Sequence, residues 1–315
     1  MPTPNSDTAL SRRKFLALSG AGTAALASGA LLGGQFVSPT SAQAEPLPSA
    51  HPMPKYPIGL ELYAVRGELA RNLPDTLRNV ALMGYEVVEF YAPYLGWTVP
   101  YAKDVRMQLD DLGLRCFSTH NAFAALTPGD TMAKAIEINQ ILGARHMIVA
   151  SPPPNTTGLE GWKRASAQFT TAAELLKPHG LFAGFHNHLV EWSPVGNGQR
   201  AMDVIAANTP PEFVLQFDVG TCLEAGADPI AWIKANPGRI RSVHLKDWTP
   251  GTAAQEKGFR VLFGESTAPW KEILATVESV GGVEFYLMEQ EGSRYPEFET
   301  ARRCLETWRT MRRSA

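Results

Sequence analysis

The feature that most restricts the fold of this chain is a regular alternation of short apolar runs with longer amphipathic stretches. Eight runs have the length and composition of buried strands, and a segment with helical periodicity follows each of them. We expect strands at residues 57–63, 86–91, 114–119, 146–150, 181–186, 213–218, 240–245 and 284–289. Helices are expected at residues 73–83, 101–112, 131–143, 160–178, 198–207, 229–235, 270–280 and 296–311. Eight such units predict an α/β fold with parallel strands and crossover helices, a single (β/α)8 barrel.

Glycines mark the ends of several expected helices. A left-handed C-terminal cap favours glycine, and five expected helices are followed by one: Gly84, Gly113, Gly143, Gly180 and Gly281. A doubly wound open sheet is the alternative fold for the same alternation. It would need a phosphate-binding loop at the start of a helix, and the chain has neither the G-x-G-x-x-G nor the G-x-x-x-x-G-K-[ST] pattern. The barrel is therefore our prediction.

The N-terminal 44 residues resemble an export signal. Residues 11–16 read SRRKFL, a Gly/Ala-rich apolar run follows, and an Ala-x-Ala site ends at Ala44. We expect residues 1–44 to be a twin-arginine signal peptide, so that the Tat machinery exports the protein to the periplasm. An uncleaved membrane anchor is disfavoured because the run lacks the sustained Leu, Ile and Val of a spanning helix. Residues 45–56 then form a Pro-rich linker, and residues 57–315 form the barrel.

Length, charge and cysteine content narrow the class of protein. Removing residues 1–44 from the 315 leaves 271, which suits one barrel of about 250 residues. A formal net charge of -2 without a clustered Lys/Arg face argues against nucleic acid or anionic lipid as a partner. The three cysteines are far apart and form no C-x-x-C pair, so no zinc knuckle is expected. Small, neutral ligands fit this chain best.

Polar residues gather where the expected strands end. In barrels of this type the active site lies at the C-terminal ends of the strands, so polar residues there indicate function. Four come from consecutive strands and form a candidate site for a divalent metal ion: His186, Asp218, His244 and Glu289. This nitrogen and oxygen set suits Mn or Zn best, with Co, Fe, Ni and Mg also open. The candidate catalytic residues around it are Glu89, His120, His188, Glu191, Lys246 and Asp247.

Some of these residues also have structural explanations. Glu191 and Asp247 have the chemistry of helix caps or salt-bridge partners. His186 and His188 lie two apart at a strand end, where both side chains can point the same way. One of the two is enough to bind the metal. The other would then donate a hydrogen bond to substrate oxygens or support the ligand, together with Glu191.

Two other histidines are assigned to structure. His146 opens an expected strand, at the end of the barrel opposite to the candidate site. His179 precedes Gly180 at the end of a helix, where a partly charged ring interacts favourably with the helix dipole. Neither residue is expected to take part in the chemistry.

Taken together, these segments resemble the sugar phosphate isomerase/epimerase family with the xylose isomerase-like TIM barrel. The segments are GLELYAVR at 59–66, GYEVVEF at 84–90, STHNAF at 118–123, FHNHLVEW at 185–192, QFDVG at 216–220, HLKDW at 244–248 and MEQE at 288–291. In that family Glu, Asp, His and Glu from the fifth to eighth strands hold a metal. The resemblance implies that Asp218, His244 and Glu289 are ligands, and it puts His186 where the family has its first Glu. The H-N-H-x-x-E form resembles a subgroup that includes 3-keto-glycoside lyases and hydrolases.

The resemblance implies a divalent-metal-dependent enzyme that works through an enediolate next to a keto group. Because the first of the two glutamates that exchange protons in the family epimerases is absent, an isomerase or lyase outcome is favoured over epimerisation. Glu289, Glu191 or one of the paired histidines would be the base. Lys246, His120 or Glu89 would orient hydroxyls or protonate a leaving group. Export and the lack of a phosphate-binding loop favour an unphosphorylated sugar or 3-keto-glycoside as substrate.

Two other functions stay open at this stage. The first is a non-catalytic barrel that kept a sugar-binding pocket. The second is a phosphodiesterase resembling endonuclease IV, which is less favoured because those barrels carry a multi-metal cluster and a basic face for nucleic acid. The sequence is compatible with an oligomer and does not specify one.

Overall fold

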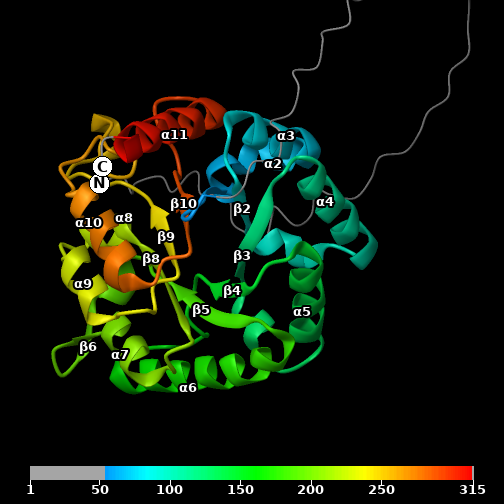
Figure 1. The fold of residues 1–315 in the computed structure, drawn as a ribbon. Helices are drawn as coiled ribbons and strands as arrows, with labels where there is room; N and C mark the ends of the chain where they lie inside the picture. The colour runs from blue at the N-terminus through cyan, green and yellow to red at the C-terminus, as the bar shows by residue number, and fades with distance from the viewer. Residues whose placement is uncertain (1–53, 314–315) are drawn as a thin grey trace, which may run out of the picture. The chain divides into compact units, whose positions relative to one another are not determined.

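The computed structural model describes residues 54–313, and in it eight parallel strands close into a barrel (Figure 1). The strands pair around the barrel in the order β1-β10-β9-β8-β5-β4-β3-β2. They are β1 (Ile58–Glu61), β2 (Val87–Phe90), β3 (Arg115–Asn121), β4 (His146–Val149), β5 (Phe182–His186), β8 (Val214–Asp218), β9 (Ser242–Leu245) and β10 (Phe285–Met288). Each lies within about two residues of its predicted position, and the predicted (β/α)8 fold is confirmed. The predicted signal peptide lies outside the described residues.

The predicted helices surround the barrel (Figure 1). They are α3 (Leu73–Met83), α4 (Val99–Asp111), α5 (Asp130–Leu142), α6 (Gly158–Leu176), α7 (Ala201–Asn208), α9 (Pro229–Ala235), α10 (Trp270–Thr276) and α11 (Glu297–Arg313). The sequence pattern did not predict the short helices α2 (Arg66–Arg71) and α8 (Val219–Glu224), nor the hairpin of β6 (Pro194–Gly196) and β7 (Gln199–Arg200). Among the described residues, no helix combines the length and apolar character needed to cross a membrane.

Four of the five predicted glycine caps adopt the left-handed conformation. Gly84, Gly113, Gly143 and Gly180 have φ values of 92°, 70°, 81° and 71°. The fifth prediction, Gly281, is wrong by one residue. A π-helical turn over Val277–Gly281 extends α10, so the left-handed residue is Gly282, with φ of 86°. The helix-to-strand joins therefore follow the expected chemistry, with one register correction.

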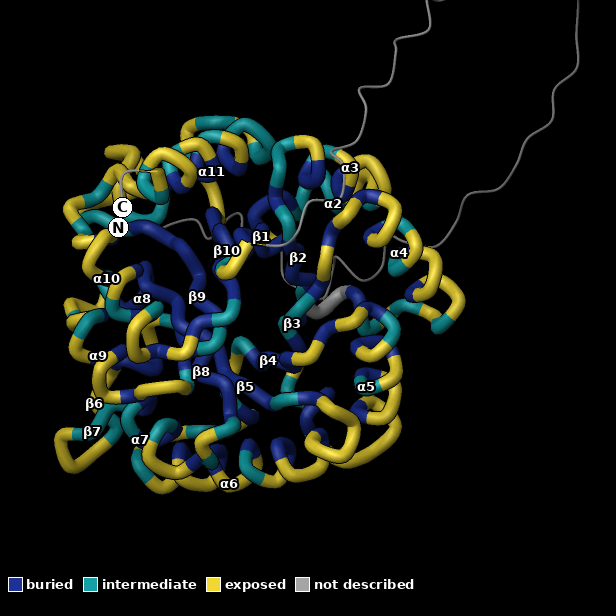
Figure 2. The backbone as a smooth tube through the Cα atoms, in the orientation of Figure 1, coloured by how far each residue is buried: buried dark blue, intermediate teal, exposed yellow. Residues whose placement is uncertain are grey.

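The barrel interior is closely packed and holds the strand ends in fixed positions. Figure 2 shows buried strands inside a ring of helices whose outer faces are exposed. All residues of β1, β2, β4, β8, β9 and β10 are buried. Gly59 lets β1 approach its neighbours, because a Cβ there would lie 2.8 Å from Leu287 Cδ2 and from the Cβ of Val87. Side chains that follow these strands are thus carried on a rigid support.

His146 has the structural place predicted from the sequence, at the N-terminal end of β4. Its side chain is 1% exposed, and neither ring nitrogen has a hydrogen-bond partner within the described part of the chain. The ring packs against Phe182 and Phe285. Burial, and then the charges of Arg241 and Arg145, lower the pKa of His146 to about 3. The folded protein therefore keeps this imidazole neutral.

We expect His146→Phe to weaken the loss of stability in acid. A histidine titrates near 6.5 in the unfolded chain, so unfolding takes up a proton below that pH. Because the folded pKa is depressed, the stabilisation is complete above about pH 6.5 and declines by up to ~1.4 kcal/mol per pH unit as the pH falls toward 3. Urea unfolding at pH 7.5 and 4.5 should give a difference in stability that is about 2–3 kcal/mol smaller in the variant. Equal pH dependence in both proteins would contradict this role.

Candidate functional site

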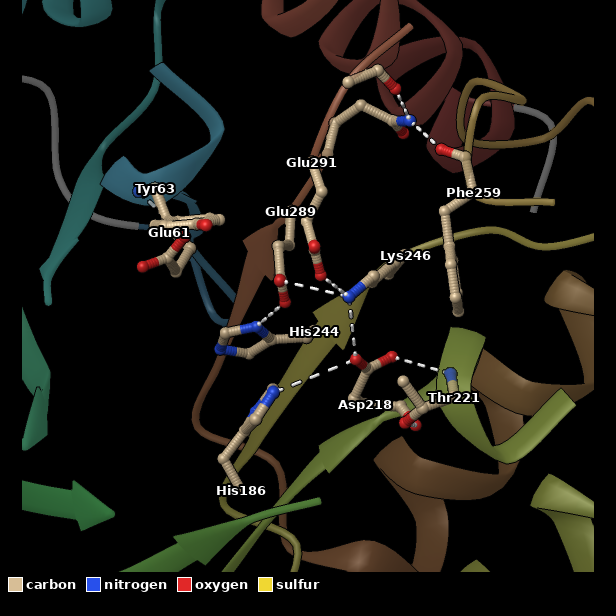
Figure 3. Close-up of polar contacts among 12 residues, drawn as sticks. Glu61, Tyr63, His186, Asp218, Thr221, His244, Lys246, Phe259, Glu289 and Glu291 are labelled. Carbon is tan, nitrogen blue, oxygen red and sulfur yellow. Dashed lines mark hydrogen bonds and ion pairs between the residues drawn. The ribbon is translucent and has the colours of Figure 1, made fainter. Parts of the chain in front are cut away.

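The candidate site is a group of buried polar side chains at the C-terminal ends of the strands (Figure 3). His244 lies at its centre, with Nδ1 2.6 Å from Glu289 Oε2 and Nε2 2.9 Å from Glu89 Oε2. Burial opposes a charge on the ring, but the two carboxylates outweigh it and raise the pKa of His244 to about 10. The imidazole therefore bridges two carboxylates that come from opposite sides of β1 in the barrel order.

One part of the cluster has the composition and spacing of a metal site. One ligand atom from each of His186, Asp218 and Glu289 lies within 4.8 Å of the others, and all three residues are buried. Asp218 Oδ1 accepts a hydrogen bond from Thr221 N at 3.1 Å and so caps α8. Asp218 Oδ2 and His186 Nδ1 are buried without a hydrogen-bond partner in residues 54–313. Buried polar atoms without a hydrogen-bond partner cost free energy unless a ligand contacts them, so this group could hold a divalent cation.

The charge state of His186 suits a ligand. Burial, followed by the neighbouring His244, His120 and His188, lowers the pKa of His186 well below its ordinary value. The ring is therefore neutral, which is the form that binds metal ions. Its Nε2 lies 3.8 Å from Asp218 Oδ2. The structure thus brings together three of the four predicted metal ligands.

The fourth predicted ligand, His244, falls in a different group. Ligand atoms of His120, His186 and His244 lie within 4.8 Å of one another, so His186 belongs to both groups. His244 reaches the first group through its contact with Glu289. Both of its ring nitrogens already face carboxylates, so it must release one of them in order to bind a metal. The role of His244 as a ligand stays a prediction.

Lys246 places a positive charge beside the group of His186, Asp218 and Glu289 (Figure 3). Its Nζ lies 3.2 Å from Glu289 Oε1 and 3.4 Å from Asp218 Oδ2, and it also contacts Glu291. The side chain is 2% exposed, and the ring of Phe259 covers Nζ at 4.7 Å. Burial opposes the ammonium form, but the carboxylates outweigh it and raise the pKa of Lys246 well above its usual value. Burial of Glu289 favours its neutral form. The charges of Lys246 and His244 outweigh burial and keep the pKa of Glu289 well below its ordinary value, so this carboxylate is ionised.

Glu89 and His120 form a hydrogen-bonded wall on the other side of His244. Glu89 Oε1 accepts from Ser118 and from Gln216 Nε2, while Oε2 lies 3.2 Å from His120 Nε2. Burial opposes ionisation, but His120 and His244 outweigh it and lower the pKa of Glu89 to about 2. His120 Nε2 also lies 2.6 Å from Gln216 Oε1. Glu89 is therefore an ionised anchor for two imidazoles rather than a free acid.

A hydrogen bond joins His188 and Glu191 at the rim of the site. The 3-10 helix η5 (Leu189–Trp192) begins here, and Glu191 accepts a hydrogen bond from His188 N at 2.8 Å. In its neutral form the His188 ring carries one N–H and can donate it. Burial lowers the pKa of His188 and raises that of Glu191 to about 7. The His188 ring lies 4.9 Å from the His186 ring.

The carboxylate of Asp247, one of the predicted catalytic residues, is bonded to groups of a neighbouring loop. Its carboxylate accepts hydrogen bonds from Trp248 N at 2.9 Å, Gly264 N at 2.9 Å and Ser266 N at 3.2 Å, and from the Ser266 hydroxyl. These bonds close the loop between residues 248 and 266, which carries Phe259. Asp247 therefore supports the loop that covers Lys246 and does not join the cluster itself.

Three site residues were missed in the sequence. Glu61 ends β1, although the pattern extended that strand to residue 63 and so left Glu61 inside it. Gln216 lies two residues before Asp218, which points its side chain to the same face of β8. Asn187 joins β5 to β8, since its side chain bonds the backbone N and O of Asp218 at 3.0 and 3.1 Å. A polar residue within an apolar run was the available signal for the first two.

Comparisons with known proteins agree with this architecture. A family model described as the xylose isomerase-like TIM barrel matches residues 77–311. The rhizopine catabolism protein MocC of Rhizobium meliloti is 27% identical over 158 residues, which is 46% of each chain. Inosose dehydratase of Mesomycoplasma hyopneumoniae (strain 7448) is 32% identical over 114 residues, 35% of each chain. The matches thus span less than half the length of these curated relatives. A sugar phosphate isomerase/epimerase structure from Parabacteroides distasonis has a TM-score of 0.69 at 22% identity, covering 83% of this chain and 97% of that one.

Proposed function

We propose that this chain, which belongs to the xylose isomerase-like TIM barrel family, is a divalent-metal-dependent enzyme that acts on a keto-sugar. The observation that carries the proposal is the buried group of His186, Asp218 and Glu289. Among the described residues, Asp218 Oδ2 and His186 Nδ1 have no hydrogen-bond partner, and the Lys246 ammonium lies 3.4 Å from Asp218 Oδ2. A divalent cation held there would supply a Lewis acid that polarises a keto oxygen. The carbon next to the keto group then becomes acidic enough for a carboxylate to deprotonate.

The residues around this group can carry the proton transfers. Glu289 stays ionised and lies in the metal-binding group, which suits it to take the proton from the carbon next to the keto group. The pair of electrons from that C–H bond moves into the enediolate, and Lys246 stabilises its negative charge. The His188 ring donates a hydrogen bond toward the departing oxygen. The electrons of the enediolate then form the C=C bond as the C–O bond of the β-carbon breaks. The departing oxygen takes up a proton and leaves as water or an alcohol, Glu289 releases its proton to solvent, and no oxidant is needed.

Elimination is the outcome that we favour over epimerisation. A symmetric epimerase needs a second carboxylate on the opposite face of the substrate, and this chain has His186 in the family position for it. One matched relative is named inosose dehydratase, and the reaction of a dehydratase is an elimination of water. Isomerisation shares the first proton transfer and differs only in where the proton returns. We further propose that residues 1–44 direct export, so that the substrate is an unphosphorylated sugar or a 3-keto-glycoside.

The test is proton exchange in deuterated water. We expect the metal-loaded protein to introduce deuterium next to the keto group of at least one member of a panel of keto-sugars, inososes and 3-keto-glycosides, as observed by NMR. Product spectra from the same samples distinguish elimination from isomerisation. Chelation should abolish the exchange, and Mn or Zn should restore it. A metal-loaded protein that binds panel members without exchange or cleavage would instead be a sugar-binding barrel.

A further inference from the structure

Three glutamates stand at the ends of three adjacent strands. In the barrel order β10, β1 and β2 are neighbours, and they carry Glu289, Glu61 and Glu89 at their C-terminal ends. Glu61 pairs with Glu89 in register, and Leu60 pairs with Met288, the residue before Glu289. His244 bonds the two outer carboxylates, one with each ring nitrogen. The hydrogen bonds within this row thus leave out the middle carboxyl, that of Glu61.

One carboxylate oxygen of Glu61 has a hydrogen-bond partner in the fold, and the other has none among the described residues. Oε2 accepts a hydrogen bond from Tyr63 N at 2.8 Å and caps the 3-10 helix η1 (Leu62–Val65). Oε1 is buried without a hydrogen-bond partner in the described structure, and the residue is 1% exposed. A helix cap needs a single acceptor, which a shorter side chain such as Asn or Ser supplies equally well. The buried second oxygen costs free energy in the unliganded protein and points to a ligand.

We propose that Glu61 Oε1 binds a hydroxyl group of the substrate, one strand beyond Glu289. The assignment rests on the proposed function, because it places a keto-polyol across these strand ends. A hydroxyl fits Glu61 in either protonation state, since it donates to a carboxylate and accepts from a carboxylic acid. Neighbouring strands lie about 4.8 Å apart, a gap that one six-membered ring with its hydroxyls spans. A ring whose keto group lies at the His186, Asp218 and Glu289 group thus presents another hydroxyl to Glu61.

This arrangement makes Glu61 a specificity-determining residue. Figure 3 shows Glu61 on the opposite side of Glu289 from Lys246 and Asp218, so it lies outside the metal-binding group. It contributes no ligand atom to either of the two metal-capable groups. We therefore expect its removal to affect the binding of polyols and to leave the metal in place. Compounds that lack the hydroxyl facing β1 should bind less tightly because Oε1 is then left unpaired.

The test compares Glu61→Gln and Glu61→Leu with the control Glu86→Gln. Gln at position 61 keeps an acceptor for Tyr63 N, whereas Leu removes both oxygens. Glu86 caps Ile58 N at 2.9 Å at the other end of the same barrel, so its variant reports any general effect of the substitution. Calorimetric titration with inosose and its monodeoxy analogues measures binding, elemental analysis measures metal content, and thermal unfolding measures stability.

We expect Glu61→Leu to keep its metal, with a small fall in unfolding temperature from the lost cap of Tyr63 N that Glu61→Gln does not show. Its affinity for inosose should fall by roughly 10- to 100-fold, with a smaller loss for Glu61→Gln and none for Glu86→Gln. One deoxy analogue should bind the wild type more weakly yet bind Glu61→Leu as well as inosose does. Unchanged affinity, loss of metal, or a lowered unfolding temperature in both Glu61 variants would overturn the assignment.

The outcome is separable from that of the proposed reaction. If the metal-loaded wild type binds inosose and Glu61→Leu does not, the assignment stands even when no deuterium exchange occurs. If the metal-loaded wild type binds neither inosose nor any other member of the keto-sugar panel, the Glu61 assignment and the polyol substrate fall together. If exchange occurs and the Glu61 variants bind and exchange like the wild type, only the role of Glu61 is overturned.

Discussion

Asp218→Asn is expected to remove the bound divalent metal and, with it, enediolate formation. Asparagine keeps an acceptor for Thr221 N, which Asp218 Oδ1 bonds at 3.1 Å, so the cap of α8 survives. The amide NH2 takes the place of Oδ2, the oxygen that faces His186 and Lys246 and accepts no hydrogen bond from residues 54–313. An NH2 group cannot bind a metal ion, and its hydrogens would point toward the cation. The variant thus separates metal binding from folding.

Elemental analysis and deuterium exchange measure the two losses together. We expect about one transition metal per wild-type chain, and a drop in the exchange rate on the order of 10³-fold or more in the variant. Asp228→Asn is the matched control, because Asp228 caps α9 through Ile230 N and Ala231 N in the same way. An Asp218→Asn protein that retains metal, or a metal-free wild type with full turnover, would rule out this centre.

The convergence of His186, Asp218 and Glu289 was predictable because barrel topology turns distant sequence positions into neighbours. Each follows an apolar run, and parallel strands in a barrel end on the same side. The local pattern of apolar residues therefore predicted where the strands end. The barrel topology then places those ends on the same side of the molecule. The same reasoning could not show that His244 bonds Glu89 across the barrel or that Lys246 is buried among three carboxylates. Those facts depend on side-chain directions beyond the ends of the strands.

Asp247 and Glu61 show the limits of a pattern in opposite ways. Asp247 adjoins a strand end, but its carboxylate binds backbone groups of Gly264 and Ser266, far along the chain, which no local pattern reveals. Glu61 belongs to the cluster, but its strand ends two residues before the predicted end. Asp247 was assigned to the site because it adjoins a strand end in the sequence. Glu61 was missed because the predicted strand extended past it. Both residues lie where loops begin, and loop geometry is set by tertiary contacts.

Lys246→Met is expected to leave the metal bound while greatly slowing the reaction. Methionine has a similar length but no charge, so the group of Asp218, Glu289 and Glu291 loses its counter-charge. With a metal bound, the cation still neutralises these carboxylates, and its affinity should rise because the ammonium no longer competes with it. The developing oxyanion loses a buried hydrogen-bond donor, which predicts a fall of about 10²- to 10⁴-fold in deuterium exchange. Metal content and activity thus move apart in this variant, whereas they fall together in Asp218→Asn.

The metal-free forms give a second, independent measure of Lys246. Removing one partner of a buried ion pair leaves uncompensated charge, so metal-free Lys246→Met should be less stable than metal-free wild type by about 3–5 kcal/mol. Adding Zn or Mn should then raise the unfolding temperature of the variant more than that of the wild type. Lys234→Met, on the exposed last turn of α9, is the control and should show neither effect. If Lys246→Met loses its metal, or responds to metal no more than the control does, the ammonium does not neutralise this centre. The exchange defect would then have to arise from packing around Phe259.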